Sequence, residues 1–258
     1  MPWYYDLFDF VGEEYFTVLN KDILRKAKKE VEIIKNALAL QPEHEILDLC
    51  CGIGRHTIPL VKSGFRVIGL DASPRLLQVA NRKAQEEGLK VEFIQGDMRE
   101  LPFQDKFNVV LNLWSSFGYL ENEEEHLKVL KSIARALKPG GKLLLDVLNR
   151  DWVVHNFQSG EEQRELGGIV EINNYQFDSA SGRDVIKTKY IVKGEIRKFT
   201  HSCRIYTLQE LQMLLEKAGL NIIQVYGGFN LRPVSLAGKQ LLIIAEKPVK
   251  NGESSSVE

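Results

Sequence analysis

The sequence predicts an α/β protein with a doubly wound, mostly parallel seven-stranded sheet that ends in an antiparallel hairpin. Short apolar runs alternate with segments of helical length, which is the pattern of a parallel sheet covered by helices on both faces. The last two runs are joined without helical periodicity, and a separate group of β-like runs precedes the final helix. With 258 residues, 44% of them hydrophobic, the chain is long enough for a single domain over residues 1–258 with a small antiparallel β insertion.

Turn and cap residues divide the parallel part of the sheet into strands and helices. A helix is expected after the first strand, ending near Ser63 before Gly64. Ser73 is a good N-cap and Pro74 suits a first turn, so another helix should run to about Glu87. The apolar runs predicted as parallel strands are residues 45–49, 66–71, 90–97, 107–114 and 141–149.

Two later helices also have clear start signals. Asn122 precedes three glutamates, which suit the positive end of a helix dipole. Thr207 and Glu210 have the spacing of a capping box, and Gly219 is expected to end that helix.

The rest of the chain departs from the parallel pattern. The last two strands, 220–226 and 239–247, are separated by only about a dozen residues rich in Gly and Pro. A parallel return normally needs a longer, helical crossover, so these strands should form an antiparallel hairpin. Residues 165–206 contain three β-like runs and are predicted as a meander inserted over the substrate site. Residues 1–40 are expected to form an N-terminal helical cap, and residues 249–258 a flexible tail.

Charge and hydropathy restrict the function classes. The formal net charge is −1, and basic and acidic residues are interleaved, so neither a nucleic-acid nor a membrane partner is indicated. The amino-terminal stretch MPWYYDLFDF carries acids where a secretory signal is basic, and no apolar run approaches the roughly 20 residues of a membrane span. A soluble cytoplasmic protein is expected.

The three cysteines do not suggest a disulfide framework or a metal site. Cys50 and Cys51 are adjacent and Cys203 is distant, without a second C-x2-C pair. Cys51 is expected to be compact, buried filler, and no metal is predicted.

Polar residues gather where four of the predicted strands end, which is where open α/β sheets bind ligands. Gly52 and Gly54 match the start of a dinucleotide-binding G-x-G-x-x-G motif, but Thr57 replaces its third glycine. Asp48 would repel a pyrophosphate and attract a cation. Asp71 follows Gly52 by 19 positions, a distance that suits hydrogen bonds to ribose hydroxyls.

The third strand ends in Asp97 and Met98, which suit an adenine. The carboxylate can accept from the adenine amino group, and the Met98 backbone N–H can donate to a ring nitrogen. Together, the residues at these strand ends suit adenosine attached to a positively charged, amine-bearing chain. A molecule of this kind is S-adenosylmethionine (SAM).

The motifs ILDLCCGIGRHT, VIGLDAS, FIQGDMRELPF, FNVVLNLW and LKPGGKLLLD follow one another in the order and spacing of the class I SAM-dependent methyltransferases. The chain resembles that family strongly over about residues 43–149. Cys50 departs from the pattern, because the family usually has glycine there. Since a residue with a Cβ atom resists positive φ, Cys50 is expected to have ordinary backbone geometry.

The resemblance implies a set of cofactor contacts. It assigns Asp48 and the loop around Cys50, Gly52 and Gly54 to the methionyl amine, which would also meet the Leu113 carbonyl. It assigns Asp71 to the ribose and Asp97 and Met98 to the adenine, and it adds Ala72 to the residues that bind the cofactor. Tyr5 would border the methionyl part beneath an N-terminal cover. Arg55 and His56, at a helix start, suit the cofactor carboxylate.

The substrate side is less specific. WSSFGYL (114–120) and the stretch from Thr200 to Gly219 are similar to small-molecule N-methyltransferases, including N,N-dimethyltransferases of deoxyaminosugars, which favours a small acceptor. In-line methyl transfer needs a base only when the nucleophile arrives protonated. Candidates are Tyr119, His155 and His201, each of which has an ordinary structural role as the alternative.

Three other functions stay open at this point: methylation of tRNA or protein, NAD-dependent oxidoreduction, and SAM binding without catalysis. The β insertion suits either a lid or a dimer surface, so both a monomer and a homodimer are compatible with the sequence.

Overall fold

The computed structural model describes residues 3–11, 13–14, 16–17 and 21–249, and its centre is a seven-stranded sheet in the order β10-β11-β5-β4-β1-β2-β3. Strands β1 to β5 run parallel, whereas β11 is antiparallel to both β5 and β10. The predicted fold class and the terminal hairpin are therefore confirmed. The strands are β1 (Glu45–Leu49), β2 (Arg66–Asp71), β3 (Glu92–Gln95), β4 (Phe107–Asn112), β5 (Leu137–Leu148), β10 (Asn221–Tyr226) and β11 (Gln240–Glu246).

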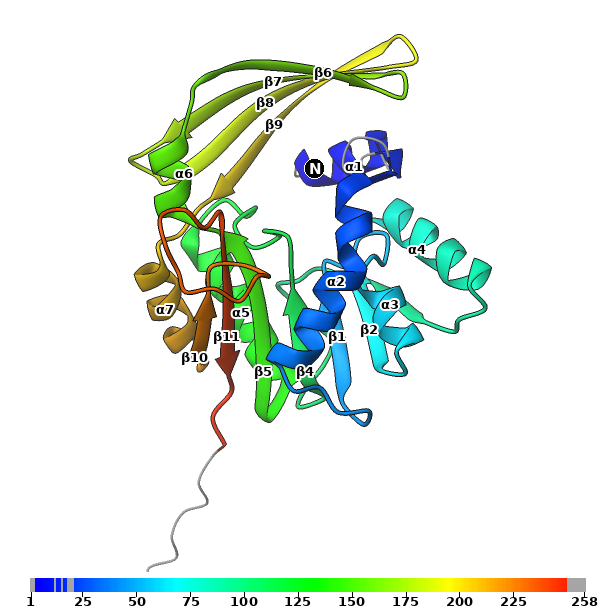
Figure 1. The fold of residues 1–258 in the computed structure, drawn as a ribbon, viewed down its shortest axis with the longest axis vertical. Helices are drawn as coiled ribbons and strands as arrows, with labels where there is room; N and C mark the ends of the chain where they lie inside the picture. Colours follow the sequence, from blue (N-terminus) through cyan, green and yellow to red (C-terminus); the bar gives the residue numbers. More distant parts are fainter. Residues whose placement is uncertain (1–2, 12, 15, 18–20, 250–258) are drawn as a thin grey trace, which may run out of the picture.

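Helices cover both faces of this sheet because alternate residues of each strand point to opposite sides (Figure 1). Leu143 and Leu145 pack in the cluster that contains α5 and α7, whereas Leu144 packs in the cluster that contains α2 and α3. The helices are α1 (Trp3–Val11), α2 (Lys21–Ala37), α3 (Thr57–Lys62), α4 (Pro74–Glu86), α5 (Glu123–Ala136), α6 (Arg150–Asn156) and α7 (Leu208–Lys217).

The predicted helix starts are confirmed. Ser73, Asn122 and Thr207 are N-caps whose side chains accept hydrogen bonds from backbone N–H groups, and Thr207 forms the full capping box with Glu210. The strand boundaries differ more. β5 begins at Leu137 rather than at 141, because the backbone of Gly140 and Gly141 pairs with Lys247 at the end of β11.

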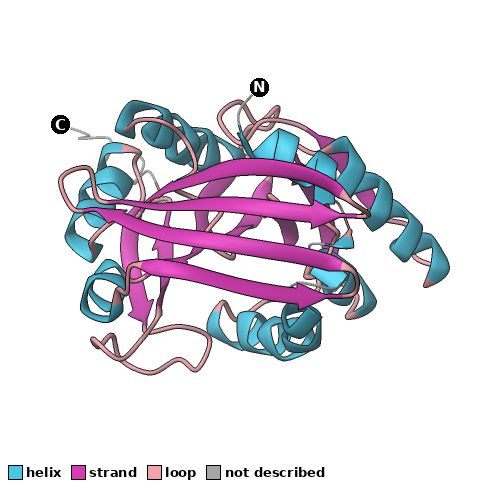
Figure 2. Ribbon diagram, turned by 90° about the horizontal axis from the view of Figure 1, so that it is seen from above, coloured by secondary structure: helices cyan, strands magenta, loops and turns pink. Residues whose placement is uncertain are grey.

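A second sheet lies across the top of the molecule, with four antiparallel strands in the order β6-β7-β8-β9 (Figure 2). Its strands are β6 (Gly160–Leu166), β7 (Ile169–Asp178), β8 (Arg183–Val192) and β9 (Glu195–Arg204). β6 begins before the predicted meander and was not expected, because GEEQREL has no apolar alternation. It is an edge strand that joins the sheet through backbone pairing with β7.

Helix α1 lies between this small sheet and the main domain (Figure 1). Its Leu7 is buried with Ile169 of β7 and Tyr190 of β8, and its Phe10 packs beside Phe199 of β9. The expected N-terminal cap therefore includes a helix held against the insertion. Residues 250–258 of the predicted tail lie outside the described residues. Within the described part of the chain, no helix combines the length and the apolar character of a membrane span.

Candidate functional site

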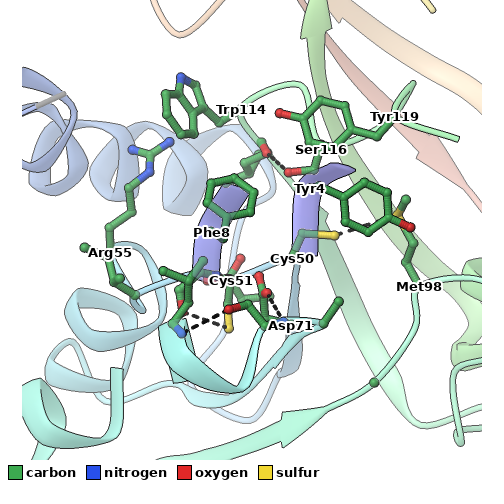
Figure 3. A pocket seen from close by; sticks show the side chains of 18 of the residues that line it. Tyr4, Phe8, Cys50, Cys51, Arg55, Asp71, Met98, Trp114, Ser116 and Tyr119 are labelled. Carbon is green, nitrogen blue, oxygen red and sulfur yellow. Dashed lines mark hydrogen bonds between the residues drawn. The ribbon is translucent and has the colours of Figure 1, made fainter. Parts of the chain in front are cut away.

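A pocket with an empty volume of about 1010 Å³ opens at the carboxyl ends of β1, β2 and β4 and is bordered by α1 (Figure 3). Most of the residues predicted to hold a cofactor border it: Tyr5, Asp48, Cys50, Gly52, Arg55, His56, Asp71, Ala72, Asp97, Met98 and Leu113. Gly54 is not among the lining residues of this pocket.

The glycine loop after β1 is tied to the end of β2 by Asp71. The Gly52 backbone N–H donates to one Asp71 carboxylate oxygen at 2.8 Å, and the Ser73 backbone N–H donates to the other at 2.8 Å. Burial raises the pKa of Asp71 above its usual value. Each oxygen keeps a second lone pair, so the carboxylate can still accept from a ligand hydroxyl.

Asp48 is only 2% exposed, yet it borders the pocket. Thr57 donates its hydroxyl to Asp48 Oδ2 at 2.6 Å. This contact explains why threonine stands where a dinucleotide site has its third glycine: its side chain orients the carboxylate. Burial raises the pKa of Asp48, and a positively charged ligand would favour its ionised form.

The expectation of ordinary backbone geometry at Cys50 is wrong. Its φ is 62°, in the left-handed region. The side chain extends between two strand ends, with Sγ 3.7 Å from Met98 Sδ and 3.7 Å from Asn112 Nδ2. The turn is fixed just beyond it, where the Cys51 backbone N–H donates to the Leu70 carbonyl at 3.0 Å. The contacts of the loop thus impose a conformation that the residue type disfavours.

Arg55 and His56 share a protein carboxylate that was not predicted from the sequence, that of Glu30 on α2. Arg55 Nη1 lies 2.6 Å and His56 Nε2 2.8 Å from the same Glu30 oxygen. Burial opposes ionisation of Glu30, but the hydrogen bonds from His56 and Arg55 lower its pKa overall. Burial also lowers the pKa of His56, so its imidazole is neutral at pH 7. The Arg55 guanidinium lies 5.7 Å from the Trp114 ring centroid.

At the end of β3, Arg99 engages the Asp97 carboxylate with both its backbone and its side chain. Arg99 Nε is 3.0 Å from each Asp97 oxygen, and the Arg99 backbone N–H donates at 2.8 Å. Burial opposes the charge on Asp97, but these bonds lower its pKa. An adenine amino group would therefore meet an ionised carboxylate that is already held in place.

The three candidate bases lie in different surroundings. Tyr119 borders the pocket, and its ring centroid is 6.3 Å from that of Tyr4 on α1. His155 lies on α6 with an exposed side chain, and His201 lies on β9; neither is among the residues that line the pocket. Burial lowers the pKa of His201 to about 4, so it is neutral at pH 7.

Several residues that border or support the pocket were not predicted to be site residues. Tyr4 and Phe8 belong to the aromatic amino-terminal stretch, and Trp114 and Ser116 to the stretch after β4, so composition gave a partial signal. The sequence provides no signal for Glu30, because it is one of many charged residues on an amphipathic helix. Among the described residues, no group of three or more His, Cys, Asp or Glu side chains is arranged to hold a metal ion.

Comparison with known proteins adds an independent finding. A methyltransferase domain model matches residues 46–141. The cypemycin N-terminal methyltransferase of a Streptomyces species is 29% identical over 209 residues, which are 78% of this chain and 82% of that protein. A SAM-dependent methyltransferase structure from Clostridium acetobutylicum superposes with a TM-score of 0.80 at 18% identity, covering 94% of this chain and 99% of that one. For the SAM-bound amino pentose methyltransferase CalS10 of Micromonospora echinaspora, the TM-score is 0.63 at 22% identity, with 86% and 91% covered.

Proposed function

Because this chain is a SAM-dependent methyltransferase with the class I fold, we propose that it methylates a small-molecule acceptor, with an amine nitrogen as the favoured nucleophile. The observation that carries the cofactor side is the pair of buried carboxylates, Asp48 and Asp71, at the edge of one pocket. This charge pattern suits a cationic nucleoside and opposes the pyrophosphate of a dinucleotide.

When bound, SAM supplies an activated methyl group on a sulfonium centre. The chain's own contribution is orientation and exclusion of water. In this proposal Asp48, held by Thr57, binds the methionyl ammonium, and Asp71 accepts from the ribose hydroxyls. Tyr4 and Tyr5 on α1 provide an apolar wall; burial raises the pKa of Tyr4 to about 12, so its phenol keeps its proton at neutral pH.

Two observations support an amine as the acceptor. CalS10 is named an amino pentose methyltransferase, and the cypemycin enzyme an N-terminal methyltransferase. In addition, Asp184 of β8 lies on the same face of the small sheet as the fully buried Tyr190, because residues an even number of positions apart share a face. Burial raises the pKa of Asp184 to about 6. Asp184 is not among the residues that line the pocket, so in this proposal its carboxylate meets the cationic amine on the side of the small sheet.

The cofactor assignment is tested by Asp71→Ala and its matched variant Asp71→Asn. We expect Asp71→Ala to weaken SAM binding by about 1 to 3 kcal/mol, the usual loss for a charged hydrogen-bonding partner, measured by isothermal titration calorimetry. Asp71→Asn keeps one carbonyl oxygen and should lose less. Unchanged SAM affinity in the alanine variant would contradict the ribose assignment.

The acceptor is tested with radiolabelled SAM and a panel of amines, hydroxy acids and sugar nucleotides. We expect label transfer to at least one amine and none to the matched alcohols. A blank panel with intact SAM binding would favour a non-catalytic SAM-binding protein. Transfer to tRNA or protein, with salt-sensitive binding, would refute the small-molecule proposal.

A further inference from the structure

One carboxylate beside the pocket is so far without a role. Asp146 lies near the carboxyl end of β5 and is only 1% exposed. Its Oδ2 accepts from the Trp114 backbone N–H at 2.9 Å, and its own backbone carbonyl accepts from the next N–H, that of Ser115, at 2.9 Å. Gln240 on β11 donates its side-chain amide to both Asp146 oxygens, at 3.0 and 3.2 Å. Gln240 therefore fixes Asp146, and Asp146 in turn accepts hydrogen bonds from two consecutive residues, Trp114 and Ser115.

Those two residues have an unfavourable backbone conformation. Trp114 has φ 58° and Ser115 has φ 56°, both in the left-handed region. A residue with a Cβ atom rarely adopts this region, and a bulky side chain there is a genuine outlier. A strained conformation persists only where its surroundings impose it, and such residues cluster at functional sites. The hydrogen bonds to Asp146 restrain the backbone of both residues directly.

The conformation also determines what the pocket wall presents. Leu113, Trp114 and Ser116 all border the pocket, and the Ser116 hydroxyl donates to the Leu113 carbonyl at 3.0 Å. The Trp114 ring lies 5.8 Å from that of Phe16 and beneath the Arg55 guanidinium. If the backbone of Trp114 relaxed out of the left-handed region, the indole and the Leu113 carbonyl would both turn away from their present positions.

We propose that Asp146 is a positioning residue of this methyltransferase: it holds Trp114 and Ser115 in the left-handed turn that places the Leu113 carbonyl and the Trp114 ring at the cofactor. Gln240 acts with it, because its amide fixes the orientation of the carboxylate. This inference rests on the proposed SAM site, but the turn itself can be observed in the protein alone.

The first test follows the conformation of the turn by tryptophan fluorescence, in the protein without cofactor. Trp3 and Trp152 are replaced by phenylalanine, which leaves Trp114 as the only tryptophan of the three in the chain. Burial raises the pKa of Asp146 to about 7; the other charged groups that act on it are Glu30, which raises its pKa, and Arg55, which lowers it. We expect the emission of Trp114 to titrate with a midpoint near pH 7, and Asp146→Asn to abolish that transition. The same titration in both proteins would overturn the proposal.

The second test reads cofactor binding. We expect Asp146→Ala to weaken SAM binding by about tenfold or more, because the Trp114 N–H loses its buried acceptor and the turn loses its restraint. Asp146→Asn, which still offers an oxygen to the Trp114 N–H, should stay within about threefold of the parent. Unchanged SAM affinity in a folded Asp146→Ala protein would refute the positioning role, whatever its loss of stability.

A compensating change separates positioning from simple stabilisation. Glycine adopts the left-handed region without strain, so Ser115→Gly in the Asp146→Ala background should recover part of the lost SAM affinity. The matched control is Ser115→Ala in the same background, because alanine also removes the hydroxyl but keeps the Cβ atom that resists positive φ, and it should recover none. Equal recovery by the glycine and alanine variants would contradict the proposal. If Asp146→Ala does not fold, the fluorescence titration of the parent and Asp146→Asn still decides it.

Discussion

Cys50 shows how a loop can force a side chain into a disfavoured conformation when that side chain has space to fill. Its thiol lies between Met98 and Asn112 at the ends of neighbouring strands, and burial raises its pKa well above the usual value. It is therefore a neutral packing group next to the pocket. The contacts it gains offset part of the cost of a left-handed residue.

We predict that Cys50→Gly leaves the free energy of unfolding within about 1 kcal/mol of the parent, because relief of the left-handed backbone offsets the lost thiol contacts. Cys50→Val should lose about 2 kcal/mol or more, since a β-branched residue tolerates positive φ poorly. Urea unfolding monitored by circular dichroism measures both. A glycine variant as unstable as the valine variant would show that the thiol contacts, and not the backbone, dominate.

For single residues, the sequence predicted which side chains border the pocket better than it predicted their hydrogen-bond partners. Asp48 and Asp71 were found because their positions at strand ends are fixed by local patterns, and both border the pocket. The partners of Arg55 and His56 could not be predicted, because Glu30 reaches them from a helix about 25 residues away in the sequence. The left-handed φ of Cys50 was missed for a related reason: the turn is set by neighbouring strands rather than by the residue.

The stretch from Leu113 to Tyr119 has hydrogen bonds to both sheets. Asp146 of the main sheet holds its beginning, and the Gly118 carbonyl near its end accepts from the backbone N–H of Arg204, at the end of β9, at 2.8 Å. Gly118 has φ 116°, and a Cβ atom there would lie 2.5 Å from the Arg204 carbonyl oxygen. Only glycine allows this close approach.

We predict that Gly118→Ala costs about 2 kcal/mol or more in the free energy of unfolding, because it adds a backbone clash to the conformational strain. Gly64→Ala is the matched control: Gly64 also has positive φ, 90°, but a Cβ atom there would meet nothing within 4 Å. It should lose only about 1 kcal/mol. Equal losses in chemical denaturation would show that the contact with Arg204 is unimportant.

Helix starts were predictable because a cap is a local interaction between residues three positions apart, as at Ser73, Asn122 and Thr207. The first strand of the small sheet was not, because β6 has mostly exposed, charged side chains and exists through its pairing with β7. The same difference between local and distant contacts determines how much of the candidate site could be predicted. The residues on each strand end follow from the sequence, whereas the placement of α1 over them depends on contacts with the distant insertion.

For the whole molecule, buried histidines give stability a pH dependence. The folded pKa of His201 is about 4, lowered by burial, whereas the ordinary value is 6.5. Between pH 4 and 6.5 the unfolded chain therefore binds more protons than the folded one, so stability is lost as pH falls through this window.

We predict that His201→Asn makes the loss of stability between pH 6.5 and 4 smaller, although His126, whose pKa burial also lowers to about 4, still contributes to it. The parent should lose up to roughly 3 kcal/mol at this site between pH 6.5 and 4, and the variant should not. The midpoints of urea unfolding, measured for both proteins across that pH range, provide the comparison. Glu171, whose negative charge raises the pKa of His201, is left unchanged in both proteins. Parallel pH profiles would contradict the assigned burial of the imidazole.

Helix α1 has one side on the pocket, through Tyr4 and Phe8, and the other on the small sheet, through Leu7 and Phe10. In the proposed site the nucleoside would lie beneath this layer and the acceptor would approach from above, so we expect a compulsory order of addition in which SAM enters first and its demethylated product departs last. Product-inhibition kinetics check this: that product should compete with SAM and act non-competitively against the acceptor. Mutual competition with the acceptor would mean that either reactant can bind to the empty enzyme.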